Sequence, residues 1–168
     1  MITRPTIVFT TGWDPFQTLI SLGTFSRAGH AAIGIGDHLL HAYEPGVVWG
    51  SRDTWFTGKH QRLIAEYEIL PDVSEGIEDC ASRIGEPYDV VGVFRAALWI
   101  MLRRLCSPLR HVGTASAASH TCSSFVMLLD PNGDRIPEWR SINRAVVTPA
   151  DLLLAAEGPS FRPILRQV

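Results

Sequence analysis

The sequence predicts one globular domain, residues 1–168, that combines β-strands with α-helices. Its length suits a single domain with a buried core. Apolar residues make up 46% of the chain and charged residues 19%, which is typical of a folded protein rather than a disordered one. Short β-branched and aromatic runs alternate with segments that begin with helix-capping residues. No internal repeat or linker-like stretch divides the chain.

Four short runs predict strands. β-Branched and aromatic residues favour strands over Thr6–Thr11 and Arg62–Leu70. Two further runs, Ala31–Ile35 and His38–Tyr43, flank the dipeptide Gly36-Asp37. Glycine at the first central position of a two-residue loop suits a type II′ turn, so these runs predict an antiparallel hairpin. The turn-rich residues 49–57 are expected to lie outside the strands.

Helices are predicted where capping residues precede longer apolar segments. In chain order they are a helix capped by Asp14-Pro15 and ended by Gly23, one opened by the box-like Asp72-Val73-Ser74-Glu75 and ended by Gly85, one over 90–105, one over 123–129, and one from Thr148 that Gly158-Pro159 ends. Residues 107–119, rich in Ser, Ala and Gly, are expected to form a loop.

Charge and hydropathy exclude several function classes. A net charge of −2 gives no electrostatic basis for binding nucleic acid or an anionic membrane surface. The apolar stretch 90–105 contains arginines and is too short to span a bilayer, so no transmembrane segment is predicted. The N-terminus lacks the apolar core of a signal peptide. We therefore expect a cytoplasmic protein, with delivery by a phage particle or secretion machine left open.

The three cysteines, Cys80, Cys106 and Cys122, favour neither a disulfide framework nor a zinc ribbon, because their number is odd and no short spacing joins them. We expect no metal site and no cofactor. Cys122 is the notable one because it opens the predicted helix over 123–129. Unsatisfied N–H groups and the helix dipole there lower a thiol pKa and stabilise an oxyanion. The alternative is a buried, inert cysteine.

Two histidines of the hairpin form a candidate pair. With Gly36-Asp37 as the turn, facing positions sum to 73, which places His30 and His41 diagonally on one face of the hairpin. One imidazole can then act as a base while the other fixes its tautomer and orientation. Glu44 falls on the opposite face, although a one-residue slip of register would reverse that choice. The alternative is a pair of ordinary strand residues.

The run Gly29-His30-Ala31-Ala32-Ile33-Gly34-Ile35-Gly36-Asp37, followed by Leu39-Leu40-His41-Ala42, resembles the histidine hairpin of the NlpC-type papain-like superfamily. The histidine hairpin here precedes the cysteine segment. That order resembles the circularly permuted branch, which includes YiiX/YaeF-like amidases and lecithin:retinol acyltransferase-like proteins. Further segments resemble YiiX/YaeF-like motifs: Gly46-Val47-Val48 with Trp55, Gly85-Glu86-Pro87-Tyr88-Asp89, Thr121-Cys122-Ser123-Ser124-Phe125-Val126, and Val147-Thr148-Pro149-Ala150-Asp151-Leu152. Thr121 and Ser124 depart from the family, which commonly has an aromatic residue and Glu there.

The resemblance implies an α+β papain-like fold, an antiparallel sheet with helices packed on it. It also implies a cysteine hydrolase, an amidase or peptidase of the thiol protease type, with a triad of Cys122, His30 and His41. The substrate would be a small molecule, a peptide such as a cell-wall linkage, or an acyl compound. Tyr88, Asp89 and His120 are candidate substrate-binding residues. The alternatives are a lipid acyl hydrolase or acyltransferase and a non-enzymatic binding protein that retains the fold; the oligomeric state is not predicted.

Overall fold

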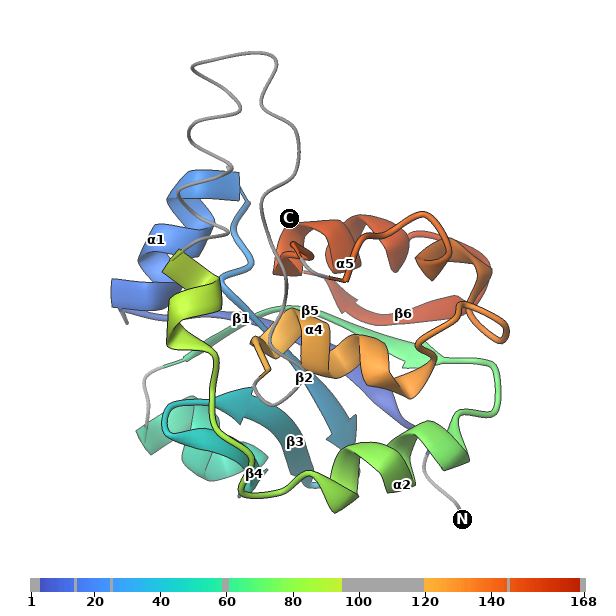
Figure 1. The fold of residues 1–168 in the computed structure, drawn as a ribbon, viewed down its shortest axis with the longest axis horizontal. Helices are drawn as coiled ribbons and strands as arrows, with labels where there is room; N and C mark the ends of the chain where they lie inside the picture. Colours follow the sequence, from blue (N-terminus) through green and yellow to red (C-terminus); the bar gives the residue numbers. More distant parts are fainter. Residues whose placement is uncertain are drawn as a thin grey trace.

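The computed structural model describes residues 4–13, 15–24, 26–58, 61–94, 120–144 and 146–166. Within them a six-stranded sheet, in the order β4-β3-β2-β1-β5-β6, is combined with several helices, so the α+β class is confirmed (Figure 1). Every pair of neighbouring strands is antiparallel. The predictions for the N-cap at Asp14, for Cys106, and for residues 95–119 lie outside the described residues.

The elements have the following bounds. The strands are β1 Thr6–Thr11, β2 His30–Ile35, β3 His38–Tyr43, β4 Gly46–Ser51, β5 Arg62–Ile69 and β6 Phe161–Arg166. The helices are α1 Pro15–Thr24, α2 Ser74–Ser82, α4 Cys122–Val126 and α5 Pro149–Ala155, and residues 90–94 are also helical. Shorter turns are the π-helical η1 Thr54–Gly58 and the 3₁₀ turns η2 Met127–Leu129 and η3 Pro137–Trp139.

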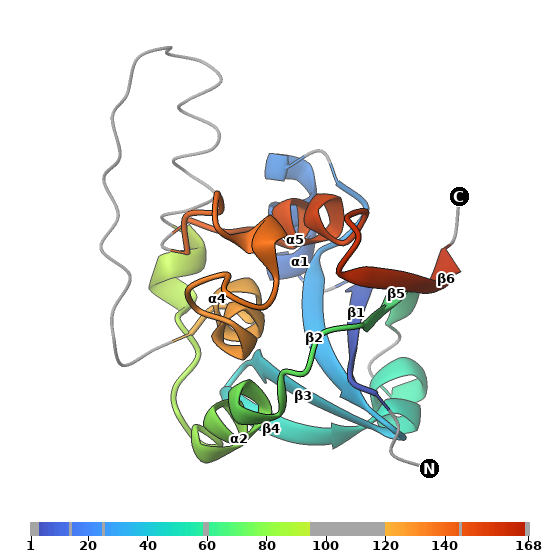
Figure 2. The same ribbon diagram turned by 90° about the vertical axis from the view of Figure 1, so that its right-hand side faces the viewer.

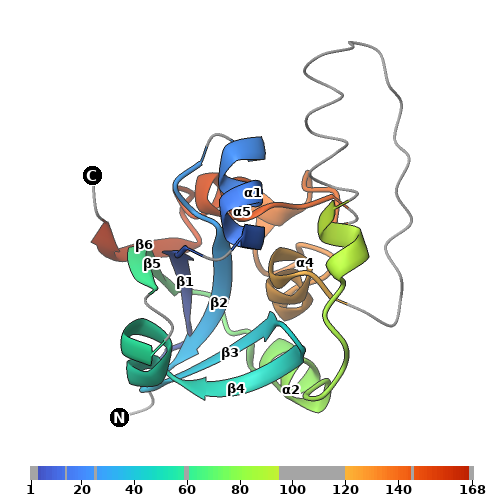
Figure 3. The ribbon, with the colours of Figure 1, turned by 90° about the vertical axis from the view of Figure 1, so that its left-hand side faces the viewer.

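The two faces of the sheet carry different cores, because successive side chains of a strand point to opposite faces. The larger core joins one face to α2, α4 and α5, and includes Phe9, Ile33 and Phe125. The smaller core lies on the opposite face, where Val8 and other strand residues pack against Trp55 of η1. Figure 2 and Figure 3 show α2 and α4 on one side of the sheet and the teal turn η1 on the other.

The predicted hairpin register is confirmed. Ile35 pairs with His38, Gly34 with Leu39 and Ile33 with Leu40, and Gly36 takes a φ of 57° in the turn between the strands. Beyond these pairs β2 continues along β1, and β3 continues along β4. The two strands therefore diverge toward His30, as Figure 3 shows, and α4 packs against both of them. This divergence leaves the start of β2, at His30, paired with β1 but not with β3.

Several sequence predictions need correction. β4 extends to Ser51 and η1 follows, where only turns were expected. β6 was not expected at all; it contains Pro163, which is tolerated because β6 is an edge strand. α2 begins at Ser74 without a capping box, because Val73 occupies the N-cap, and Asp72 Oδ1 accepts the Ser74 N–H at 3.0 Å. The predicted starts of α1 and α5 are confirmed.

Candidate active site

Cys122 is the first residue of α4, and the preceding loop fixes the start of that helix. Thr121 is the N-cap: its Oγ1 accepts the Ser124 N–H at 3.2 Å. Ser124 Oγ in turn accepts the Thr121 N–H at 3.0 Å, which completes a capping box. The two positions that depart from the family pattern thus hold the helix start in place. A T-x-x-S signal in the sequence could have identified this box.

The sulfur of Cys122 is enclosed between α4 and β2. Cys122 is only 2% exposed, and the nearby backbone N–H of Ala31 favours the charged form of the thiol. Ser123 Oγ lies 3.9 Å from the sulfur. Ala31 follows His30 in β2, and successive side chains of a strand point to opposite faces. The side chain of Ala31 lies in the larger core with α4, whereas the His30 ring packs against Trp55 of the smaller core. Among the described residues no hydrogen bond joins Sγ to His30 directly, and such bonds are often long before substrate binds.

His30 and His41 lie together, as the hairpin register predicts. His30 Nε2 and His41 Nδ1 are 2.9 Å apart, and the two residues are 1% and 2% exposed. One of these two nitrogens must donate a proton and the other must accept it, so two neutral arrangements are possible. Only one of the two leaves His30 Nδ1 unprotonated. In that arrangement His30 donates Nε2–H to His41, and its Nδ1 carries a free lone pair.

Aromatic side chains enclose this pair. The indole of Trp55 lies 5.1 Å from the His30 ring and 4.5 Å from the His41 ring, measured between centroids. Tyr43 lies 5.6 Å from His30 and 4.9 Å from Trp55. Burial, reinforced by the nearby His41, holds the pKa of His30 well below 6.5, and burial lowers the pKa of His41 to about 4. Both rings are therefore neutral at pH 7.

Burial also affects the pKa of the Cys122 thiol, in the direction opposite to the one predicted from the sequence. It raises the pKa of Cys122 above its ordinary value, and hydrogen bonds from Ala31 and Ser123 offset this only in part. The predicted lowering of the pKa by the helix start was wrong, because removal of the thiolate from water outweighs the helix-terminal N–H groups. At neutral pH the resting site therefore holds a thiol and neutral imidazoles rather than a thiolate–imidazolium pair.

Glu44, the alternative third residue, lies away from the pair. It is exposed in the turn between β3 and β4, directly before Pro45, whereas His41 is buried against His30. The confirmed register of β2, β3 and β4 therefore separates Glu44 from His30. Of the two candidates, only His41 is within hydrogen-bonding distance of His30.

The candidate binding residues Tyr88, Asp89 and His120 hold the chain that leads to Cys122. Tyr88 and His120 form a β-bridge, and the Asp89 N–H donates to the His120 carbonyl at 3.0 Å. His120 Nε2 lies 2.7 Å from a carboxylate oxygen of Glu86, and the Val47 N–H of β4 donates to the Glu86 carbonyl. These contacts tie residues 86–89 and 120 to the edge of the sheet. The structure thus gives the three residues a positioning role, and their role in substrate binding stays a prediction.

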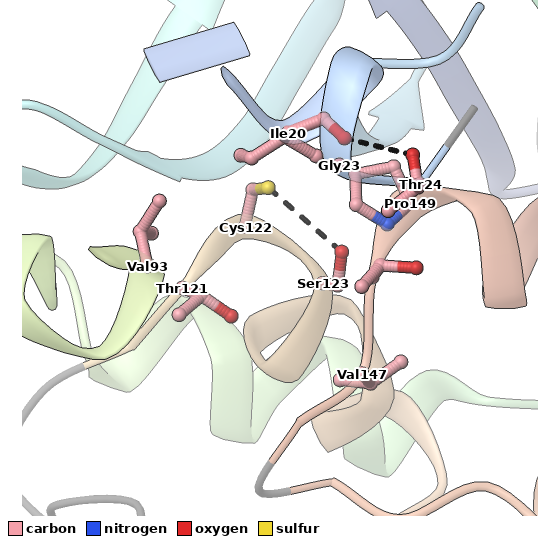
Figure 4. Close-up of a pocket in the computed structure, with 10 residues that line it drawn as sticks. Ile20, Gly23, Thr24, Val93, Thr121, Cys122, Ser123, Val147 and Pro149 are labelled. Atoms are coloured by element: carbon pink, nitrogen blue, oxygen red, sulfur yellow. Dashed lines mark hydrogen bonds between the residues drawn. The ribbon is translucent and has the colours of Figure 1, made fainter. Parts of the chain in front are cut away.

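A small pocket adjoins Cys122, and α1 supplies one of its walls (Figure 4). Its volume of about 30 Å³ holds about two water molecules. The lining residues are Ile20, Gly23, Thr24, Val93, Thr121, Cys122, Ser123, Val147, Thr148 and Pro149. Sequence reasoning missed the contribution of α1, because nothing in the local pattern of residues 15–24 shows which helix will pack beside the nucleophile. A substrate larger than this volume requires the walls to move.

Within the described residues, no three His, Cys, Asp or Glu side chains cluster in a way that could hold a metal ion. The same part of the chain has no helix of the length and apolarity that crossing a membrane requires. No family model matches the chain, and no curated protein sequence matches it significantly.

Proposed function

We propose that this protein is a cysteine-nucleophile acyl hydrolase that uses Cys122, His30 and His41. One observation carries the proposal. Cys122 opens a capped helix that packs against β2 and β3, and Nε2 of His30, the first residue of β2, lies 2.9 Å from Nδ1 of the buried His41. A nucleophile, a base and a group that orients the base are the three parts that covalent acyl transfer needs.

In the proposed mechanism His30 Nδ1 accepts the proton of Cys122 as the sulfur attacks the substrate carbonyl carbon. The C–S bond forms, and the carbonyl oxygen becomes an oxyanion near the backbone N–H of Cys122. His30 then gives the proton to the leaving amine, alcohol or thiol as its bond to carbon breaks. A water molecule, deprotonated by His30, attacks the acyl-enzyme and releases the acid. Another acceptor in place of water would make the protein an acyltransferase.

The neutral resting state of Cys122 and His30 determines when the proton is transferred. Because burial keeps Cys122 protonated and His30 uncharged at pH 7, the proton moves during the attack rather than before it. His41 holds the His30 ring and faces the imidazolium that forms in this step. The shielding by Trp55 keeps water from competing for the bond between the two rings. These features support general-base catalysis by His30.

We also propose that the fold is the circularly permuted papain-like one. Three features support this: the histidine hairpin precedes the cysteine helix, α4 packs against β2 and β3, and the sheet is antiparallel. On this basis the first substrate class is an amide or peptide, such as a cell-wall linkage. The second is a lipid ester or thioester, which the apolar walls of the pocket beside Cys122 favour. A purely binding protein would have no need of both Cys122 and His30.

A turnover panel tests the proposal. Purified protein would be incubated at pH 7 with matched amide, ester and thioester substrates that share one acyl group. We expect turnover of at least one class, with a loss of 10²-fold or more in both Cys122→Ala and His30→Ala. Cys80→Ala serves as the matched control, since this buried thiol donates to the Phe125 carbonyl and lies in the core. Equal rates in wild type and Cys122→Ala would overturn the proposal.

A further inference from the structure

The pocket beside Cys122 has walls that suit a hydrocarbon. Ile20 and Val93 face it from α1 and the helical residues 90–94, and Val147 and Pro149 face it from the start of α5 (Figure 4). The sulfur of Cys122 lies at the same pocket, so a group bound there is held next to the nucleophile. At about 30 Å³ the pocket is only the starting point of such a site, and an acyl chain attached to the attacked carbonyl would enter it as its walls move apart.

The hydroxyl groups of the pocket are already used by the protein. Thr24 Oγ1 donates to the Ile20 carbonyl at 2.8 Å, within α1. Thr121 and Thr148 each serve as the N-cap of a helix, and their hydroxyls are bonded in the two capping boxes. Ser123 Oγ lies against the Cys122 sulfur. A polar substrate side chain would find these groups engaged, whereas an aliphatic chain requires no hydrogen bond.

Gly23 leaves room in one wall. It is buried near the end of α1. Apart from its chain neighbours and the backbone of its own helix, no atom of the described residues lies within 4 Å of the place where its Cβ would be. Gly23 lies in the last turn of α1 and does not have a positive φ, so its backbone conformation does not require glycine. The same residue lines the pocket next to Cys122. A side chain at this position would enter space that the pocket otherwise keeps open.

We propose that this pocket is the subsite for an aliphatic acyl chain and that Gly23 determines the chain length it accepts. As a statement about substrate class, this inference rests on the proposed function. Binding of an alkyl tail in the pocket can be measured whether or not the protein turns over a substrate. Any thiol-reactive molecule with an alkyl tail that reaches Cys122 should place the tail against Gly23.

Alkyl methanethiosulfonates with methyl, butyl and octyl tails test the subsite directly. Their rate of disulfide formation at Cys122 would be followed by peptide mass spectrometry in wild type, Gly23→Ala and Gly23→Leu. We expect Gly23→Leu to lower the octyl-to-methyl rate ratio by about 10- to 200-fold, which is the discrimination a hydrophobic pocket gives for a small change in size. Gly23→Ala should lower it less. Thr18→Ala, an exposed position of α1, is the matched control and should keep the wild-type ratio.

The outcomes distinguish a failure of the proposed subsite from a failure of the proposed function. An octyl-to-methyl ratio that is the same in wild type, Gly23→Ala and Gly23→Leu would overturn the subsite. The backbone of Gly23 has no positive φ and accepts either side chain, and a urea unfolding curve for each variant confirms that it is folded. Parallel assays with p-nitrophenyl acetate and octanoate report on turnover. Chain-length selectivity in labelling without any ester or amide turnover would support the subsite and overturn the proposed function.

Discussion

Acid should destabilise this protein through its buried histidines. The pKa of His41 is about 4 in the folded protein and 6.5 in the unfolded chain, so the unfolded chain binds a proton first as the pH falls. Stability is therefore full above pH 6.5 and is lost progressively down to pH 4. A pKa of 4 rather than 6.5 corresponds to about 3 kcal/mol, which is a large part of the usual 5–15 kcal/mol of a domain. His30 adds to the loss, because its pKa is also lowered.

Urea unfolding at a series of pH values measures this effect. Wild type should lose unfolding free energy between pH 6.5 and 4.5, above the range in which the carboxylates titrate. His41→Gln, which cannot be protonated, should be less stable at pH 7 but should lose about 2–3 kcal/mol less across that window. His38→Gln, at an exposed position of β3, is the control and should follow wild type. Parallel curves for wild type and His41→Gln would refute the reasoning.

Three further predictions follow from the site. In a pH–rate profile, the acid limb of kcat/KM should lie well below pH 6.5, because burial lowers the pKa of the base His30. A limb at or above pH 6.5 would contradict this. Gly46→Ala should lower the unfolding free energy by about 1–3 kcal/mol in urea titrations, since its methyl group would meet the backbone carbonyl of Glu86; Gly50→Ala in the same strand has ordinary contacts and should be near neutral. Thr121→Val should cost about 1 kcal/mol by the same assay through loss of the helix cap, and a full recovery in Thr121→Ser is expected.

The hairpin could be predicted from the sequence because its information is local. A two-residue turn fixes which residues face each other, and the register then brings His30 and His41 together without knowledge of any other strand. The helix starts at Cys122 and Pro149 were also local, since the residues that cap them precede them directly. These two kinds of signal correctly placed Cys122 at the start of a helix and His30 beside His41.

What the sequence could not predict depends on long-range packing. β4 carries glycines and β6 carries a proline, so both resemble loops until their neighbours in the sheet are known. The raised pKa of Cys122 has the same origin. The local signal, a helix start, favours the thiolate, but the burial that outweighs it comes from β2 and α1, which are about 90 or more residues away in the chain.

An acyl-enzyme on Cys122 tests the central claim most directly. The protein would be mixed with an activated ester or thioester, quenched in acid within seconds, and examined by intact mass and peptide mass spectrometry. The proposed mechanism predicts one added acyl group on Cys122, absent from Cys122→Ala and formed far more slowly in His30→Gln. A stable adduct on Cys80 or Cys106 instead, or turnover that persists in Cys122→Ala without any adduct, would contradict it.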